Sequence, residues 1–291
     1  MIIIKITGGL GNQLFQFALG LTLEETFGIK VKYDLMEYKN GGSRKFDLDK
    51  FVNGLEIATK EEIEDKYNLY QKAKFQISKL LGFPFGLKGL KYYLERNFQY
   101  DEKVFDLDDD IYLSGYWQSE KYFINHRIEI LERIKISDSD SPQNMTYLRQ
   151  IRTSNSVSIH VRRGDYISNS QTNSIYASCD LGYYEKAIQF LSSQLEDLIF
   201  YVFSDDMEWV TTNFSKFNRM IFVNVNLGDT AFEDLKLMSN CKHNIIANST
   251  FSWWAAWLNQ NSNKIVIAPK VWYKNLYDNN LEIVPNTWLK F

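Results

Sequence analysis

Short apolar runs alternate with segments of helical period along most of the chain. The first run, Ile2–Ile6, is too short for a helix and rich in β-branched side chains, which predicts a buried strand. It leads into a glycine-rich loop, Gly8–Gly11, after which apolar residues recur at helical spacing as far as Gly28, with Asn12 placed as an N-cap. Val31–Tyr33 is a second candidate strand. This part of the chain is therefore predicted to form a βαβ unit.

The pattern is less regular over residues 34–110. Residues 59–81 are predicted to be helical, Ile111–Leu113 has the composition of a strand, and residues 118–135 carry apolar side chains at helical spacing. Ser137–Pro142 is polar, rich in turn-forming residues and free of large apolar side chains. This last segment predicts a boundary between two domains.

Two domains, residues 1–140 and 141–291, follow from this boundary, and the tail after residue 270 is expected to pack back on the first. In the second domain, apolar runs are separated by segments of helical period, which predicts a parallel sheet with helices on both faces. The fold class is therefore α/β, with a doubly wound second domain that binds nucleotides in loops at the carboxyl ends of its strands. The predicted strands are Val157–Val161, Leu198–Phe203, Met220–Val225, Asn244–Ala247 and Ile265–Ala268.

Composition and charge narrow the function. Hydrophobic residues make up 45% of the chain and charged residues 24%, which is ordinary for a globular protein, and the net charge is −3. Because there is no long basic run, the chain lacks the electrostatic field on which non-specific nucleic-acid binding relies. Any anionic ligand must therefore be held by a local arginine site.

The cysteines and the N-terminus suggest neither a metal site nor a membrane anchor. Cys179 and Cys241 are the two cysteines, and no Cys/His pairs have metal-ligand spacing, so buried, idle thiols are expected. The N-terminus lacks the pattern of a signal peptide, and no apolar stretch reaches the length of about 18 residues needed to span a bilayer. These features predict a cytoplasmic protein.

The first candidate binding loop begins with Arg162, directly after the predicted strand that carries His160. The guanidinium groups of Arg162 and Arg163 match phosphate oxygens, and Gly164 allows the backbone to approach a ligand closely. The alternative is a surface arginine pair bridged to Asp165. The position at a strand end, beside a histidine, favours an anion site that neutralises a pyrophosphate.

The second loop carries Asp205 and Asp206 after the next strand of this domain. Two carboxylates at a strand end can bind a metal ion, accept hydrogen bonds from a ribose or an arginine, or cap the helix expected near Met207. Capping is the preferred interpretation. Two further acidic clusters, Asp108–Asp110 and Asp138–Asp140, do not follow a convincing strand and are interpreted as solvated loops.

The third loop, Asn248 to Phe251, follows a predicted strand and opens a helix. Small hydroxyl side chains at a helix N-terminus can cradle a phosphate, although Ser249 or Thr250 could equally serve only as a helix cap. The tryptophans that follow at helical spacing are expected in the core rather than as a platform for a sugar ring; they are Trp253, Trp254 and Trp257.

The fourth loop lies in the first domain, over Thr7–Gln16. Its glycines, including Gly9 and Gly11, do not have the spacing of the dinucleotide-binding fingerprint. Two interpretations remain: a loop that brings its backbone and Asn12 close to a substrate, or a tight turn between strand and helix.

The four loops together resemble those of the bacterial-type α-1,2-fucosyltransferases of glycosyltransferase family 11. The matching segments occur in the family order and run from residue 8 to residue 257, so the resemblance covers nearly the whole chain. The glycine loop and the Asn-Ser-Thr-Phe-Ser-Trp run are the most specific, whereas His-x-Arg-Arg is shared with α-1,6 and protein O-fucosyltransferases. The segments are Gly8–Gln16, His160–Tyr166, Phe203–Asp206 and Asn248–Trp257.

The resemblance implies a GT-B fold, in which two Rossmann-like domains face a cleft, with the acceptor largely on the first domain and GDP-fucose on the second. The implied reaction transfers L-fucose, with inversion and without a metal or other cofactor, to the 2-hydroxyl of a terminal galactoside in bacterial surface glycan synthesis. An acceptor on a lipid carrier would bring the enzyme to the periphery of the inner membrane.

The resemblance also implies roles for individual residues. Arg162, with Arg163, would hold the diphosphate, His160 and Asp205 would lie near the nucleotide, and Asp234 matches a carboxylate that binds guanine. Asn12 matches an asparagine near the reacting sugar, in the loop that carries Gly9 and Gly11. The diphosphate would be lined by Asn248, Ser249, Thr250 and Phe251.

The resemblance does not supply a proton acceptor for the reaction. The α-1,6 relatives carry a glutamate shortly after the His-x-Arg-Arg-x-Asp motif, but residues 166–177 contain no carboxylate or histidine. Asp165 is the hypothesised base; the alternative is a loose transition state in which the proton leaves late. Tyr38, Phe46 and Trp117 are candidates to stack on acceptor sugars or simply to pack. Two other functions stay open, an α-1,6-fucosyltransferase and an inert glycan- or sugar-nucleotide-binding protein.

Overall fold

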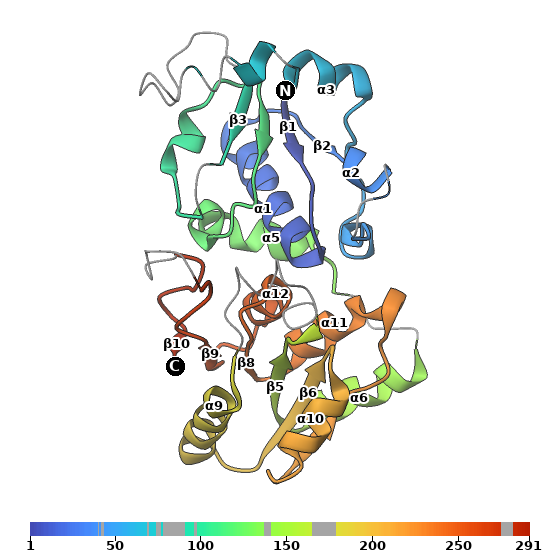
Figure 1. The fold of residues 1–291 in the computed structure, drawn as a ribbon, viewed down its shortest axis with the longest axis vertical. Coiled ribbons are helices and arrows are strands. Elements are labelled where there is room, and N and C mark those ends of the chain that lie inside the picture. The colour runs from blue at the N-terminus through green and yellow to red at the C-terminus, as the bar shows by residue number, and fades with distance from the viewer. Residues whose placement is uncertain are drawn as a thin grey trace. The chain divides into compact units, whose positions relative to one another are not determined.

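A computed structural model describes residues 1–39, 41, 44–68, 70–73, 77, 91–95, 98–136, 141–164, 179–274 and 282–291. The chain forms two compact units, Met1–Lys135 and Ile136–Phe291. Each unit contains a parallel sheet with helices against it (Figure 1). The predicted α/β class is confirmed; the arrangement of two domains across a cleft, and the packing of the tail on the first domain, stay predictions.

The first unit is built around four parallel strands in the order β2-β1-β4-β3. β1 lies in the middle, pairs with β2 and β4, and is buried along most of its length, as its apolar composition requires. The predicted βαβ unit is confirmed. The elements are β1 (Ile2–Lys5), α1 (Leu10–Phe27), β2 (Val31–Asp34), α2 (Met36–Lys39), η1 (Leu48–Lys50), α3 (Lys60–Lys66), β3 (Tyr92–Leu94), η2 (Glu102–Asp106), β4 (Tyr112–Ser114), η3 (Glu120–Tyr122), η4 (Ile124–His126) and α5 (Arg127–Arg133).

Helix α1 begins two residues earlier than its predicted cap. Gly9 is the N-cap and supplies no side-chain hydrogen bond, so the expectation that Asn12 caps the helix is wrong. The amide of Asn12 is engaged elsewhere, because its Oδ1 accepts a hydrogen bond from Gln118 Nε2 at 2.9 Å. The predicted end is confirmed: Gly28 takes a left-handed φ of 63°, and its N–H bonds Glu24 O.

The predicted helix over residues 118–135 is divided into two short 3₁₀ turns, η3 and η4, and the helix α5. Ser119 caps the first turn by accepting a hydrogen bond from Lys121 N, and Phe123 then leaves the helical region, with a φ of −148° and a ψ of 4°. The apolar spacing does not mark one buried face, because Ile124 and Ile128 are exposed whereas Tyr122 and Ile130 are buried. Of the helix predicted over residues 59–81, α3 accounts for the first part, and much of the remainder lies outside the described residues.

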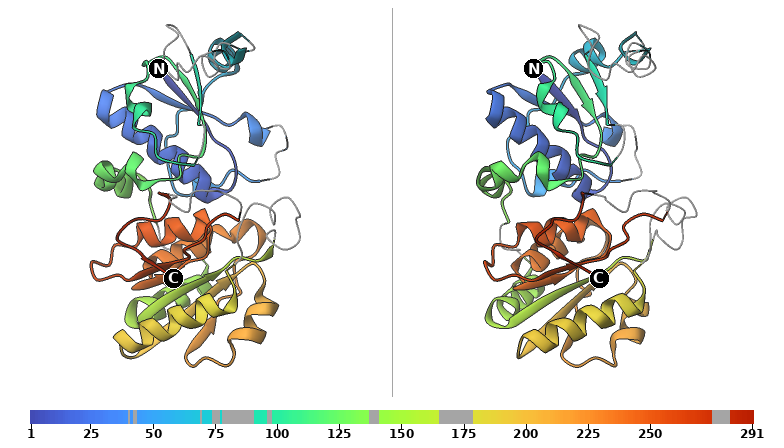
Figure 2. Two further views of the ribbon diagram at one scale, coloured as in Figure 1. Left: turned by 60° about the vertical axis from the view of Figure 1, so that its left-hand side comes forward. Right: turned by 90° about the vertical axis from the view of Figure 1, so that its left-hand side faces the viewer.

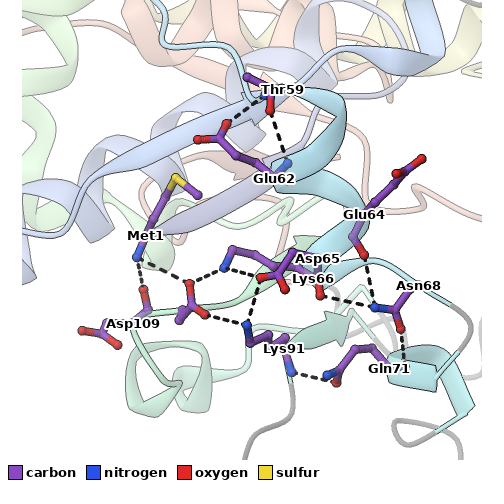
Figure 3. A network of polar contacts seen from close by, with 11 residues as sticks. Met1, Thr59, Glu62, Glu64, Asp65, Lys66, Asn68, Gln71, Lys91 and Asp109 are labelled. Atoms are coloured by element: carbon purple, nitrogen blue, oxygen red, sulfur yellow. Dashed lines mark hydrogen bonds and ion pairs between the residues drawn. The ribbon is translucent and has the colours of Figure 1, made fainter.

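A network of charged groups covers the amino end of the first sheet (Figure 3). Lys66 is almost fully buried and pairs with Asp110, and Lys91 Nζ lies 3.2 Å from Asp110 Oδ2 and 2.9 Å from Asp65 Oδ2. Because these partners anchor the starts of β3 and β4, this edge has a structural role. A binding or catalytic role is therefore expected at the opposite edge, at the carboxyl ends of the same strands.

The second unit contains six parallel strands in the order β10-β9-β8-β5-β6-β7. The predicted parallel sheet is confirmed, and each predicted apolar run contains or overlaps a strand. The elements are α6 (Pro142–Thr153), β5 (Asn155–Val161), α9 (Leu181–Gln194), β6 (Leu198–Ser204), α10 (Met207–Phe214), β7 (Met220–Phe222), η5 (Gly228–Thr230), α11 (Phe232–Asn240), β8 (His243–Ile245), α12 (Thr250–Leu258), β9 (Val266–Ala268) and β10 (Leu289–Lys290).

Side chains of β5 alternate between the two faces of this sheet. Val157, Ile159 and Val161 belong to an apolar cluster with residues of α9 and α10. Ser156 and Ser158 point the other way, where Ser156 Oγ bonds Ile151 O of α6 and Ser158 Oγ accepts from Asn244. α6, α11 and α12 pack together on that second face (Figure 2). Both faces of β5 are therefore buried, one by apolar packing and the other with its serines hydrogen-bonded.

The connections of this sheet diverge at its centre. From β5 the chain passes through α9 to β6 on one side, whereas α11 returns it to β8 on the other side of β5. Ligands of doubly wound sheets bind at such a switch point, outside the carboxyl ends of the two strands. A ligand is therefore expected to bind at the loops that follow β5 and β8.

Candidate active site

Arg162 and Asp205 meet at the switch point of the second sheet. Arg162 follows β5 and Asp205 follows the neighbouring β6, and Arg162 Nη1 lies 3.0 Å from Asp205 Oδ2. The other carboxylate oxygen of Asp205 accepts the backbone N–H of Arg163 at 2.8 Å. A Cβ atom on Gly164 would lie 2.8 Å from Asp205 Oδ2, so a larger residue there would displace the carboxylate from its present position. Asp205 thus positions the Arg162 guanidinium, which stays partly exposed.

The neighbouring arginine has different surroundings. Arg163 Nε lies 3.2 Å from Asp206 Oδ2, and its guanidinium carbon stacks 4.0 Å from the centre of the Trp209 ring. Asp206 also caps α10 by accepting the N–H of Trp209, as predicted. Arg163 thus contacts residues at the start of α10, whereas Arg162 contacts Asp205 in the loop after β6. The pair predicted from sequence therefore divides into two roles. Asp165 lies outside the described residues.

His160 lies one residue before the end of β5 and is 6% exposed. Burial lowers its pKa to about 4; Asp205 opposes this shift and Arg162 adds to it. The imidazole is therefore neutral at physiological pH. Its Nδ1 is buried and has no hydrogen-bond partner among the described residues, and its ring lies 5.8 Å from that of Phe251. A ligand group that donates or accepts a hydrogen bond would satisfy this nitrogen.

The loop after β8 presents the start of α12 to the same edge. Ser249 is the N-cap of α12 but makes no capping hydrogen bond with its side chain, so the interpretation of Ser249 as a plain cap is wrong. Ser249, Thr250 and Phe251 are partly exposed at the positive end of this helix. Asn248 instead is buried and donates to Trp272 O at 3.0 Å, which ties the loop to the following segment.

The tryptophans behind this loop are in the core, as predicted. Trp253, Trp254 and Trp257 are almost fully buried and pack on one another, with ring centroids 5.2–6.3 Å apart. They make α12 a rigid base for the loop at its start.

Both cysteines are free and buried, as predicted, and burial raises the pKa of Cys179 to about 11.

Asp234 lies in the first turn of α11, among buried amides that the sequence did not identify. Asn226 Nδ2 donates to Asp234 Oδ1 at 2.8 Å, and Asn226 exchanges two hydrogen bonds with Asn144, at 2.8 and 2.9 Å. Burial raises the pKa of Asp234 to about 7, against the hydrogen bond from Asn226 and with a small contribution from Glu233. Asn144 and Asn226 together fix the orientation of this carboxylate.

The loops at the carboxyl ends of the first sheet form a second polar cluster, within the first unit. Gly8 takes a φ of 80°, and a Cβ atom there would lie 2.5 Å from Asn12 Nδ2. Gly9 has open space around it, and Gly11 is inside α1. Gln13 bonds Gly8 O and Lys45 O and accepts the N–H groups of Asp47 and Leu48. The glycine loop is thus braced from within the unit.

Two glutamates of this cluster were not anticipated. Glu37 follows β2 by three residues and Glu95 directly follows β3. β3 is three residues long, too short for periodicity to reveal, so the sequence offered no signal for Glu95. Of the three aromatic candidates, Trp117 is fully buried and packs, whereas Tyr38 and Phe46 are partly exposed with ring centroids 5.6 Å apart.

Neither a metal centre nor a membrane span is found in the described part of the chain. No three His, Cys, Asp or Glu side chains there are grouped to hold a metal ion. No helix among the described residues has the length and apolar character to cross a membrane.

Comparison with known proteins adds three findings. The family described as "Glycosyl transferase family 11" matches residues 1–290. Alpha-1,2-colitosyltransferase of Escherichia coli is 35% identical over 301 residues, which cover 100% of this chain and 98% of the relative. Galactoside 2-alpha-L-fucosyltransferase SEC1 of Bos taurus is 30% identical over 152 residues, 50% of this chain and 41% of the relative.

Solved structures with a related fold include a plant protein. A mutant of FUT1 from Arabidopsis thaliana, in complex with GDP, superposes with a TM-score of 0.51 at 10% sequence identity. The superposition covers 91% of this chain and 69% of that one. At this identity the likeness concerns the fold alone.

Proposed function

The chain belongs to glycosyltransferase family 11, and from this premise we propose that it transfers L-fucose from GDP-fucose to the 2-hydroxyl of a terminal galactoside, with inversion and without a metal. The observation that carries the proposal is the Arg162–Asp205 pair after β5, at the edge where the loop after the adjacent strand β8 begins α12. Two kinds of positive group, a guanidinium and a helix N-terminus, converge where a diphosphate would bind.

Leaving-group departure accounts for this arrangement. As the bond between the fucosyl carbon and the β-phosphate breaks, negative charge grows on GDP. A guanidinium fixed by Asp205 stabilises that charge more in the transition state than in the ground state. Arg162 and the N–H groups at the start of α12 would therefore do the work that a divalent cation does in other enzymes. A local site of this kind also lets a chain of net charge −3 bind an anion.

Asp234 would bind the guanine base in this scheme, and His160 would contact the nucleotide. A carboxylate can accept both the N1–H and the 2-amino group of guanine, and it must be ionised to do so. His160 is neutral, and its unpartnered Nδ1 can bond a ribose or phosphate group. Asn12, on the first unit, would contact the sugars. An acceptor on a lipid carrier would make the enzyme peripheral to the membrane.

Donor and product analysis test the proposal. We expect GDP-fucose and a β-galactoside such as lactose to give a product whose new linkage, determined by NMR, is α-1,2. GDP-colitose is the competing donor, because the full-length relative is named a colitosyltransferase and colitose is L-fucose without its 3-hydroxyl. A site that hydrogen-bonds that hydroxyl rejects the deoxy sugar strongly.

Each outcome of this experiment is informative. Exclusive use of GDP-colitose would replace the donor and keep the reaction class. An α-1,6 product would contradict the linkage. Binding of GDP-fucose without any GDP release, in the presence of a panel of galactosides, would indicate an inert binding protein and contradict the proposal.

Asn226→Asp is expected to weaken GDP binding by about 10–100-fold at pH 7, because it replaces the donor to Asp234 with a second carboxylate. Two adjacent carboxylates do not both ionise readily, so the pair keeps a proton that guanine binding must displace. Affinity should therefore recover towards pH 9. Calorimetric titration with GDP across this range makes the measurement.

The matched control is Asn213→Asp, since Asn213 bonds the backbone of its own helix, α10. It should leave GDP affinity unchanged at every pH. An Asn226→Asp protein that bound GDP like the wild type at pH 7 would show that the amide does not position the base-binding carboxylate.

A further inference from the structure

We propose that Glu95 is the group that accepts the proton of the acceptor hydroxyl, at the carboxyl end of the first sheet. This inference rests on the proposed function and assigns the one role in it that the sequence left open. The acceptor sugar would bind at the loops that follow the strands of the first unit, where Glu95 and Asn12 belong to one hydrogen-bonded constellation.

The carboxylate of Glu95 is fixed by two backbone donors from the loop after β4. Its Oε2 accepts Tyr116 N–H at 2.6 Å and its Oε1 accepts Trp117 N–H at 3.1 Å. Each carboxylate oxygen retains a second lone pair, which leaves Glu95 able to accept a further hydrogen bond from a hydroxyl. Glu95 as a residue is partly exposed, while its carboxylate is largely buried beside these two donors.

The loop that holds Glu95 has unusual backbone requirements. Trp117 takes a left-handed φ of 56°, which is unfavourable for a bulky residue, and its side chain is fully buried. A Cβ atom on Gly115 would lie 2.5 Å from Glu95 Cβ, so the loop passes Glu95 at a distance that only glycine permits. Strain of this kind persists where the surroundings fix it, and it is concentrated at functional sites.

Glutamine side chains join this loop to the glycine loop. Gln16 Nε2 donates to Gly115 O at 2.9 Å while its Oε1 accepts Thr7 N–H at 3.0 Å. Gln118 Nε2 donates to Asn12 Oδ1 at 2.9 Å. Asn12 is the residue that the family resemblance assigns to the reacting sugar. Glu95 is thus held in a fixed relation to it, within one rigid unit.

The second glutamate of the cluster is a poorer base. Thr7 Oγ1 lies 2.6 and 2.7 Å from the two oxygens of Glu37, and Lys5 Nζ lies 3.2 Å from Glu37 Oε2. Partial burial acts to raise the pKa of Glu37, but the hydrogen bonds from Thr7 and Lys5 outweigh it and hold this pKa below its ordinary value. Burial raises the pKa of Glu95 to about 7, against its two backbone hydrogen bonds.

The contrast assigns the roles. A general base works best when its pKa is near the working pH, and two carboxylates whose pKa values are moved apart indicate which one takes up a proton. Among the described residues, Tyr116 and Tyr122 are the titratable groups influenced by the charge of Glu95, and burial raises the pKa of both phenols, which stay neutral near pH 7. Lys5 and Glu37 also act on Tyr116.

The proposed step balances as follows. The acceptor oxygen forms a bond to the anomeric carbon while the bond from that carbon to the β-phosphate oxygen breaks. The electron pair of the broken bond leaves with GDP, and the hydroxyl proton passes to the carboxylate of Glu95. Glu95 then releases this proton to water, so the products are the fucosylated acceptor, GDP and one proton.

The first test compares Glu95→Gln with Glu37→Gln at saturating GDP-fucose. We expect wild-type kcat to fall tenfold for each pH unit below about 7. Glu95→Gln should lower kcat by about 10²–10⁴-fold at pH 8, the range for loss of a general base. It should also abolish the acid limb, which is the fall of kcat below about pH 7. Glu37→Gln should keep the limb. Loss of the limb in Glu37→Gln, or its retention in Glu95→Gln, would overturn the assignment.

A second acceptor distinguishes a base from a residue that only holds the loop. Fluorine at C3 of the galactoside makes the neighbouring 2-hydroxyl more acidic, so its reaction depends less on a base. Glu95→Gln should therefore lose at least tenfold less activity with the 3-fluoro acceptor than with the ordinary one. Equal losses on both acceptors would mean that Glu95 merely shapes the loop.

Two controls keep the result interpretable. Unchanged GDP affinity and circular dichroism would show that Glu95→Gln is folded, and Glu95→Asp, which keeps the charge, should retain the acid limb with a smaller loss of kcat. The wild-type product reports on the proposed function itself. If the wild type transfers no fucose, the proposed function fails. If the wild type transfers fucose and the Glu95 variants have the same kinetics, the proposed function stands and only the assignment of Glu95 fails.

Discussion

Arg162→Ala is expected to lower the turnover of GDP-fucose by about 10³–10⁵-fold, the effect of removing an arginine that stabilises charge on a phosphate leaving group. Arg162 is half-buried, and Asp205 fixes its guanidinium at the switch point. The variant removes a contact that strengthens as the leaving group departs, so kcat should fall much more than the affinity for GDP. Steady-state kinetics and GDP titration measure the two effects separately.

Arg163→Ala is the matched control. It removes an identical side chain at the next position, but one that is paired with Asp206 and stacked on Trp209. We expect a modest loss of stability and a loss of turnover below about tenfold, because the Arg163 guanidinium is held by Asp206 and Trp209 at the start of α10. Unchanged turnover in Arg162→Ala, or equal losses in the two variants, would contradict the mechanism.

Asp234→Asn is expected to weaken GDP binding by about 10²–10³-fold at pH 8, because two charge-assisted hydrogen bonds to guanine are worth about 1.5–3 kcal/mol each and one partner is partly retained. In the wild type, affinity should fall as the pH is lowered through 7, where the carboxylate takes up a proton. Protonation of the GDP phosphate adds a slope common to both proteins, so the difference between their pH profiles isolates Asp234.

The same substitution should make the unliganded protein more stable. Because the pKa of Asp234 in the folded state, about 7, is above its ordinary value, folding favours the protonated form. The destabilisation by this carboxyl therefore begins near its ordinary pKa of about 4, grows as the pH rises, and is complete above pH 7. Asparagine carries no such charge, so the melting temperature should rise most at pH 8, less at pH 5, and hardly at all below pH 4. A lower melting temperature at pH 8, or GDP affinity like that of the wild type, would contradict the assignment.

Several features of the fold could be predicted because they depend on local patterns. Continuous apolar runs predicted the positions of β1 and β6, since a strand buried on both faces needs apolar side chains along its length. Gly28 ended α1 because the left-handed conformation after a helix favours glycine. Asp206 was predicted correctly as the cap of α10 for the same local reason.

Other elements could not be predicted, because contacts distant in the sequence decide them. β3 has three residues and no periodicity; it is a strand because β4 offers it a partner. Asn12 had the composition of a cap, yet its amide bonds Gln118, 106 residues away, and Gly9 begins the helix. The apolar spacing over residues 118–135 is real, but Phe123 breaks it into turns.

For the candidate site, the sequence by itself determined the chemistry that the chain brings to its loops: two arginines after β5, hydroxyl groups before α12, and a carboxylate in α11. Only the tertiary structure decided which of them act together. Asp205 selects Arg162 from the arginine pair, the two buried asparagines orient Asp234, and a short strand carries Glu95 to the loop that holds Asn12. The reason is that the sequence gives the type of each side chain directly. The orientation, burial and pKa of that side chain depend on neighbours that the sheet topology brings from remote parts of the chain.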